Sequence, residues 1–251
     1  MATAKMIYGT AWKKERTAAL VVSAVLSGFR AIDTAGQPKH YREDLVGEAL
    51  EILQKEHNIR REDLFLQTKF TSLGGHDLSK PIPYNPNSRL ETQINDSFNN
   101  SLKNLRTTFI DSYILHSPLE TLSRTITAWK ALMSLQDSGK VKYIGVSNTY
   151  DVSVLEALER DGGRRVQVVQ NRWFEGNGWD AKVLSYCRKQ GPSGRSPARH
   201  PSSNAQRSRH SPRQRDALQR RPSIVSPTRK ESLRSAGPRM RSTCARTLVW
   251  R

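Results

Sequence analysis

The segment from Phe29 to Leu50, FRAIDTAGQPKHYREDLVGEAL, constrains the fold of this chain more than any other stretch. A short apolar run ends at Asp33, and a polar loop containing glycine and proline follows it. From Tyr41 onward, apolar residues recur at i, i+4 and i+8, which is the spacing of an amphipathic helix. The segment therefore predicts a strand, a loop and a helix. A carboxylate stands where the strand ends, and a phenol stands just before the helix.

The same alternation of strand and helix continues along the chain. Short apolar runs predict strands at 6–12, 29–33, 64–70, 110–115, 141–146 and 166–169. Helical spacing predicts helices at 15–27, after 41, at 88–105, 122–137 and 151–160, and from 183 onward. Strands that alternate with helices indicate a parallel sheet with right-handed crossovers. A loop at 72–87, rich in glycine, proline and asparagine, is long enough to shape a binding pocket.

Polar residues end nearly every predicted strand. The first strand ends on Gly9–Thr10, and the others end on Asp33, Lys69, His116, Ser147–Asn148 and Gln170–Asn171. This arrangement is typical of an α/β fold of the (β/α)8 TIM-barrel type, because active sites there lie at the carboxyl ends of the strands. A doubly wound sheet is the alternative, but no Gly-x-Gly-x-x-Gly follows the first strand.

The motifs at these strand ends resemble those of one protein family. DTA, a gap, Tyr and EDLVGEAL come in that order at 33–50, and TKF, LHSPL, IGVSN and VVQNRW follow at later strand ends. Over residues 6–191 the chain resembles the aldo-keto reductases, which are oxidoreductases with a TIM-barrel fold. The resemblance implies NADPH, or less often NADH, at the mouth of the barrel and a small carbonyl compound as substrate.

The resemblance also implies which residues act. The implied catalytic residues are Asp33, Tyr41, Lys69 and His116. The implied cofactor-binding residues are Gly9, Thr10, Asp33, Ser147, Asn148 and Gln170, and the last three would grip the nicotinamide carboxamide through amide and hydroxyl groups.

The chemistry of these residue types suits carbonyl reduction. Hydride transfer to the carbonyl carbon builds negative charge on the oxygen, which must then receive a proton. Tyr41 is the expected proton donor, and a neighbouring Lys69 is expected to lower its pKa from about 10. Asp33 would hold Lys69 in place, and His116 would hydrogen-bond the carbonyl oxygen.

Each residue taken alone has an ordinary structural explanation. Asp33 or Ser147–Asn148 could cap a helix, and a single lysine or histidine at a strand end is usually just solvated or hydrogen-bonded. The functional interpretation rests on the combination of an acid, a phenol, an amine and an imidazole at successive strand ends. No metal site is expected, because the histidines have no i, i+4 pairing and no cysteine at ligand spacing. Trp12 is open to two interpretations, as a pocket-lining residue or as part of the core.

Charge is distributed unevenly along the chain. The net charge is +18, but residues 192–251 alone hold fifteen Lys and Arg against two acids.

The basic residues Lys13, Lys14 and Arg16, followed by the apolar run 18–26, resemble a signal peptide. We interpret this segment instead as the first barrel helix. Two cysteines make no disulfide framework, so a cytoplasmic protein without a membrane span is expected.

The composition changes abruptly after Gly191. Residues 192–251 hold fourteen Arg, eleven Ser and seven Pro, which predicts a disordered basic tail after an incomplete barrel of six strand–helix units at 1–191. The tail could bind RNA or anionic surfaces, could carry a targeting or phosphorylation signal, or could be an unselected extension, such as a shifted reading frame. We favour the last interpretation. An incomplete barrel would expose sheet edges and an apolar interior.

The incomplete barrel leaves two functions open. One is the reductase, with weakened NADPH binding because the resemblance places the phosphate-binding loops after strands seven and eight. The other is a catalytically impaired remnant whose basic tail binds RNA or anionic surfaces. The sequence leaves the substrate and the oligomeric state undetermined.

Overall fold

The computed structural model describes residues 6–190 and 248–249 of the chain. Its strands form one sheet in which each strand pairs with the next along the sequence. The strands are β1 (Tyr8–Gly9), β2 (Ala31–Asp33), β3 (Phe65–Phe70), β4 (Ile110–Leu115), β5 (Val141–Ser147), β6 (Val168–Gln170) and β7 (Leu248–Val249). Strands β1 to β6 are parallel, whereas β7 runs antiparallel to β6.

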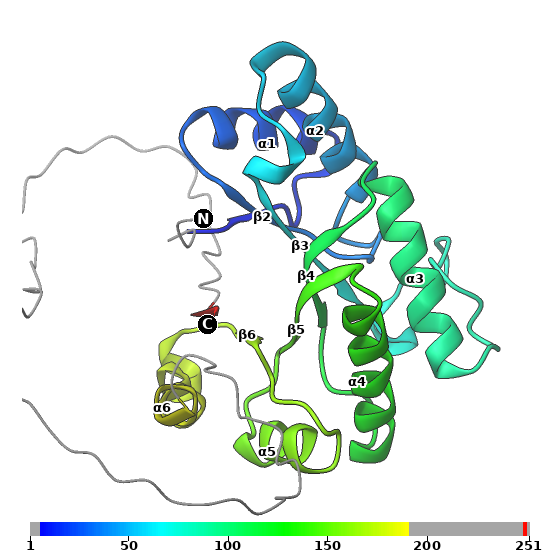
Figure 1. Ribbon diagram of the computed structural model, residues 1–251, viewed down its shortest axis with the longest axis vertical. Coiled ribbons are helices and arrows are strands. Elements are labelled where there is room, and N and C mark those ends of the chain that lie inside the picture. Colours follow the sequence, from blue (N-terminus) through cyan, green and yellow to red (C-terminus); the bar gives the residue numbers. More distant parts are fainter. Residues whose placement is uncertain (1–5, 191–247, 250–251) are drawn as a thin grey trace, which may run out of the picture. The chain divides into compact units, whose positions relative to one another are not determined.

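Helices alternate with the parallel strands, as the sequence predicts. They are α1 (Thr17–Leu26), α2 (Glu43–His57), α3 (Leu90–Asn104), α4 (Leu122–Asp137), α5 (Val152–Arg160) and α6 (Ala181–Gln190). Figure 1 shows the sheet curling, with the helices on its convex side. The fold is thus α/β and matches part of a (β/α)8 barrel, which confirms the predicted fold class.

Local sequence explains where the first two helices end. The run at 18–26, which resembles a signal peptide, is helix α1, and Gly28 follows it with a φ of +103° that only glycine adopts easily. Helix α2 begins two residues after Tyr41 and stops at Asn58, which has a left-handed φ of 51°. Helix α2 buries Val46, among others, in the apolar core.

Alternation along β3 separates two environments. Gln67 on β3 bonds to Asp33 on β2 and to Gln170 on β6, which are not neighbouring strands, so these side chains meet across the concave side of the sheet. Thr68, the next residue, instead bonds to Glu43 of α2 on the convex side. The concave side is therefore polar at this level, and the expectation of an exposed apolar interior is wrong here.

The apolar core lies between the sheet and the helices. Phe98 of α3 packs edge-on against Tyr113 of β4 at 5.0 Å between ring centroids, and both are fully buried. Trp129 of α4 is fully buried, and its ring nitrogen donates to the carbonyl of Arg164 at 3.0 Å. Burial of this apolar layer is the main contribution to the stability of such a fold.

Two predictions fall largely outside the described residues. The basic tail at 192–251 is described only at Leu248–Val249, so its predicted disorder and the domain boundary after 191 stay predictions. Those two residues pair with Val168–Val169 at the outer edge of β6. No helix in the described part of the chain is long and apolar enough to cross a membrane.

Candidate active site

Strands β2 and β3 place a buried ion pair at their carboxyl ends. Lys69 Nζ lies 2.6 Å from Asp33 Oδ1 and 2.7 Å from the carbonyl oxygen of Thr34, and it donates to both. The two side chains are only 2% and 8% exposed. An ammonium this deeply buried requires a carboxylate partner, so the pair fixes the position of Lys69. The structure brings these two predicted residues together.

Two glutamines complete the shell of Asp33. Gln67 Nε2 bridges Asp33 Oδ1 (2.8 Å) and Gln170 Oε1 (2.9 Å), and Gln170 Nε2 donates to Asp33 Oδ2 at 3.1 Å. Ser112 donates to Gln67 Oε1 at 2.9 Å, so each polar group of Gln67 has a partner. Gln67 was not among the predicted site residues, although it stands two residues before Lys69 and alternation places both on one face of the strand.

Tyr41 faces this ion pair from the loop before α2. Lys69 Nζ lies 5.2 Å from the centroid of its ring, and the ring of His116 stands edge-on at 5.8 Å. Burial raises the pKa of Tyr41 above its usual value; Lys69 lowers that pKa and Asp33 raises it. The expected lowering of the Tyr41 pKa is therefore wrong in net direction, because burial of the phenol outweighs a cation that Asp33 already neutralises.

His116 follows β4 on the other side of Tyr41. Its Nδ1 lies 2.7 Å from Thr71 Oγ1, and its backbone N–H donates to the carbonyl of Phe70. Burial lowers the pKa of His116 to about 3, with the positive charge of Lys69 acting in the same direction. His116 is therefore neutral at physiological pH and can donate a hydrogen bond from one ring nitrogen only.

The residues expected to grip a nicotinamide lie together at the ends of β5 and β6. Ser147 Oγ donates to the carbonyl of Gln170 at 2.6 Å, and Asn148 Nδ2 donates to the carbonyl of His116 at 2.7 Å. Asn148 has a left-handed φ of 50°. Asp151, rather than Ser147 or Asn148, caps α5, so the simple capping explanation does not hold. A neutral set of amide and hydroxyl groups of this kind fits a carboxamide.

Gly9 and Thr10 lie at the end of β1, beside Asp33. Thr10 Oγ1 donates to the backbone carbonyl of Asp33 at 2.9 Å, and Gly9 is in register with Asp33. A side-chain carbon placed on Gly9 would meet nothing within 4 Å, so the backbone there borders open space. These two residues therefore adjoin the ion pair without contacting its charged atoms.

Trp12 lies at the rim rather than in the core. It is 62% exposed, and its ring stacks on that of His40 at 3.6 Å between centroids. His40 Nδ1 is buried and has no hydrogen-bond partner among the described residues. The described residues contain no group of three His, Cys, Asp or Glu that could hold a metal ion.

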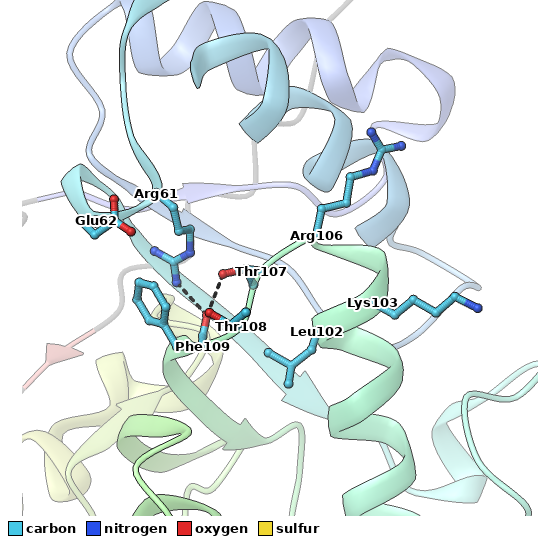
Figure 2. A pocket seen from close by; sticks show the side chains of 8 residues that line it. All are labelled: Arg61, Glu62, Leu102, Lys103, Arg106, Thr107, Thr108 and Phe109. Atoms are coloured by element: carbon cyan, nitrogen blue, oxygen red, sulfur yellow. Dashed lines mark hydrogen bonds between the residues drawn. The ribbon is translucent and has the colours of Figure 1, made fainter. Parts of the chain in front are cut away.

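A separate groove of about 470 Å³ lies near the amino ends of β3 and β4. Its lining residues are Arg61, Glu62, Leu102, Lys103, Arg106, Thr107, Thr108 and Phe109 (Figure 2). Arg61 is only 10% exposed, bonds to Asp111 at 2.7 Å and stacks on the Phe109 ring at 4.2 Å. Figure 2 shows Lys103 and Arg106 pointing away from Phe109. Arg61 thus ties the start of β3 to β4, whereas its buried Nε has no hydrogen-bond partner among the described residues.

The Aldo/keto reductase family model matches residues 4–192 of the chain. This chain belongs to the aldo-keto reductase family. Among curated relatives, methylglyoxal reductase DkgA of Salmonella typhimurium is 33% identical over 154 residues, which make up 61% of this chain and 48% of that protein. Glyoxal reductase of Bacillus subtilis is 31% identical over 171 residues, or 68% of this chain and 53% of that protein.

Solved aldo-keto reductases share the fold over part of their length. A crystal structure of an aldo-keto reductase from Brucella melitensis matches 74% of this chain and 64% of its own, with 28% identity and a TM-score of 0.59. The chain spans about half the length of the curated relatives it matches. Membership of the family is therefore established for the barrel portion, whereas activity needs separate support.

Proposed function

We propose that this chain reduces small aldehydes or ketones to alcohols with NADPH, NADH being possible, and that Tyr41 donates the proton. The observation that carries the proposal is the buried Lys69–Asp33 pair beside the Tyr41 ring, with the neutral imidazole of His116 next to it. NADPH would supply the hydride when bound. All other parts of the reaction fall to side chains of this chain.

Tyr41 and Lys69 divide the proton chemistry. Burial raises the Tyr41 pKa, so the phenol carries its proton at neutral pH and can give it to a carbonyl oxygen that gains charge. The ammonium of Lys69 stabilises the phenolate that remains, because it lies 5.2 Å from the ring in a buried site. Asp33 keeps Lys69 aimed at the ring, and His116 donates a hydrogen bond to the substrate oxygen.

We propose Ser147, Asn148 and Gln170 as the residues that hold the nicotinamide carboxamide, with Gly9 and Thr10 bordering the same space. Their support is their clustering beside Asp33 and their neutral hydrogen-bonding groups. An aldo-keto reductase of Bombyx mori, solved in complex with NADP, shares the fold with a TM-score of 0.57 at 21% identity. A cytoplasmic location and a barrel domain ending near residue 191 belong to the same proposal.

Small dicarbonyl compounds are the substrates to test first, since two relatives are named methylglyoxal reductase and glyoxal reductase. The test is NADPH oxidation by the purified chain with methylglyoxal, glyoxal and simple aldehydes. Turnover should fall by about 10²–10⁴-fold in Tyr41→Phe, the contribution of a general acid. Tyr143→Phe, which alters a half-buried tyrosine on β5 away from the site, should retain activity. Equal turnover in Tyr41→Phe and the unaltered chain would rule out Tyr41 as the donor.

The second candidate function is that of a catalytically impaired barrel whose basic tail binds RNA or anionic surfaces. Fourteen arginines within residues 192–251 favour binding to RNA or anionic surfaces. RNA affinity that falls steeply with salt, together with a lack of NADPH oxidation in the folded chain, would favour this candidate. Salt-insensitive or undetectable RNA binding would eliminate RNA as the partner of the tail.

A further inference from the structure

Thr71 lies immediately after β3 and contacts three residues near the candidate active site: His116, His76 and Tyr84. Its hydroxyl oxygen lies 2.7 Å from His116 Nδ1. Its backbone carbonyl accepts hydrogen bonds from His76 Nε2 (3.0 Å) and from the Tyr84 hydroxyl (2.9 Å). Thr71 is only 3% exposed, so solvent has little access to these groups. The residue thus connects the long loop at 72–87 to the histidine beside Tyr41.

The direction of the Thr71–His116 hydrogen bond follows from counting hydrogens. The described residues offer Thr71 Oγ1 no other hydrogen-bond partner, so its single hydrogen has one place to go, the lone pair of His116 Nδ1. The reverse direction would leave a buried hydroxyl hydrogen without an acceptor, which costs free energy. A neutral imidazole that accepts at Nδ1 must carry its hydrogen on Nε2.

Packing holds the Thr71 hydroxyl in this direction. A side-chain carbon built on Gly75 would lie 2.6 Å from Thr71 Cγ2, so the backbone of Gly75 lies directly against that methyl group. Gln37 Nε2 donates to the carbonyl of Gly75 at 2.6 Å and anchors this turn. With its methyl group against Gly75, the Thr71 side chain presents its hydroxyl to His116.

We propose that Thr71 is a positioning residue that holds His116 in the Nε2–H tautomer, so that Nε2 is the atom that donates to the carbonyl oxygen of the substrate. The inference rests on the proposed reductase function for its purpose. Its structural content, the tautomer, is independent of turnover. Thr71 itself touches neither substrate nor cofactor in this scheme and acts through His116.

The tautomer can be measured directly in the full chain labelled with ¹⁵N-histidine. Two-bond ¹H–¹⁵N correlations distinguish the two ring nitrogens, and the His116 signals are those missing in His116→Gln. We expect Nε2–H for His116 in the unaltered chain and in Thr71→Ser, which keeps the hydroxyl. Thr71→Val has the same shape without the hydroxyl, and the Nδ1–H form of His116 should rise at least severalfold.

His76 provides the matched control in the same spectra. Its Nε2 donates to the backbone carbonyl of Thr71, which no side-chain substitution removes, so His76 should remain Nε2–H in every variant. An unchanged His76 signal also reports that the loop is still folded. If Thr71→Val does not fold, Gly75→Ala offers a second route, because the added methyl displaces the Thr71 side chain while its hydroxyl is retained.

Two outcomes would overturn the inference: Nδ1–H on His116 in the unaltered chain, or no change of tautomer in folded Thr71→Val. A correct tautomer in a chain that oxidises no NADPH would instead count against the proposed function alone. In an active chain, Thr71→Val should lower kcat/KM, whereas Thr71→Ser, which keeps the hydroxyl, should retain the kcat/KM of the unaltered chain.

Discussion

At the scale of single residues, the buried ion pair of Lys69 and Asp33 determines both the position of the neighbouring side chains and part of the stability of the fold. Lys69 is 2% exposed at the side chain, and its ammonium bonds only to Asp33 and the Thr34 carbonyl among the described residues. The pair also fixes the positions of Gln67 and Gln170, because both side chains donate hydrogen bonds to the Asp33 carboxylate. Removing one charge should therefore affect stability as well as chemistry.

Lys69→Met should lower the free energy of unfolding by about 3–5 kcal/mol, because it leaves Asp33 as a buried carboxylate without its cation. The double variant Lys69→Met/Asp33→Asn should recover much of this loss. Urea unfolding followed by circular dichroism measures both, and Lys142→Met on the exposed side of β5 serves as the control. A double variant no more stable than Lys69→Met would contradict the explanation.

His116 should make stability depend on pH. Its pKa is lowered to about 3 in the folded chain by burial and by the nearby charge of Lys69, whereas an unfolded histidine titrates near 6.5. Between about pH 6.5 and about pH 3 the unfolded chain binds a proton that the folded chain does not. The free energy of unfolding therefore falls as pH falls through this window, by up to about 1.4 kcal/mol per pH unit.

Urea unfolding at several pH values tests this contribution. His116→Gln should remove part of the slope between about pH 6.5 and about pH 3. His57→Gln, at the exposed end of α2, serves as the control for a histidine substitution. Identical slopes in His116→Gln and the unaltered chain would show that His116 does not titrate as described.

At the scale of elements, Glu43 fixes helix α2 against its neighbours. Its carboxylate accepts hydrogen bonds from Thr68 of β3 (2.6 Å) and Ser101 of α3 (3.1 Å), and burial raises its pKa. Tyr41 stands two residues before Glu43 and Lys69 one residue after Thr68. The same anchor thus sets the spacing between the phenol and the ammonium.

Glu43→Ala should lower the free energy of unfolding by about 1–3 kcal/mol, because it leaves the buried hydroxyls of Thr68 and Ser101 without an acceptor. Glu48→Ala is the matched control, since Glu48 is exposed on the same helix and its loss should change stability by less than about 0.5 kcal/mol. Thermal or urea unfolding distinguishes the two. Equal effects from both substitutions would refute the anchoring role.

At the scale of the whole molecule, the described barrel ends at β6 and its following helix. Beyond α6 only Leu248–Val249 are described, and they pair antiparallel to β6 where a regular barrel continues with parallel strands. The chain spans about half the length of its curated relatives. The side chains that we propose as catalytic and carboxamide-binding nonetheless all lie within β1 to β6 and the loops that follow them.

NADPH binding should consequently be weak, with a Kd above about 1 µM, equivalent to less than about 8 kcal/mol of binding free energy. The family resemblance places the phosphate-binding loops after strands seven and eight, so the contacts expected here are those to the nicotinamide end. Titration of NADPH fluorescence with the full chain measures the Kd. A submicromolar value would mean that other parts of this chain bind the phosphates.

The sequence alone was sufficient for the order of elements and for the residues at the strand ends. Hydrophobic periodicity is a local property, so the strands at Phe65–Phe70 and Ile110–Leu115 were predicted within a residue or two. The motif around Asp33 and Tyr41 likewise indicates the family from the sequence alone. Neither inference required knowing which distant residues touch.

The tertiary structure decided the electrostatics and the support of the site. The pKa of Tyr41 is raised rather than lowered because the phenol is buried by tertiary packing, which no local pattern reports. The role of Gln67 in the site depends on tertiary structure, because it bonds to Asp33 and Gln170, which are 137 residues apart and meet across the curled sheet. Thr71 gained its role from a contact with His116, 45 residues away. Desolvation and hydrogen-bond direction arise from packing between distant segments, and packing is decided only in the folded chain.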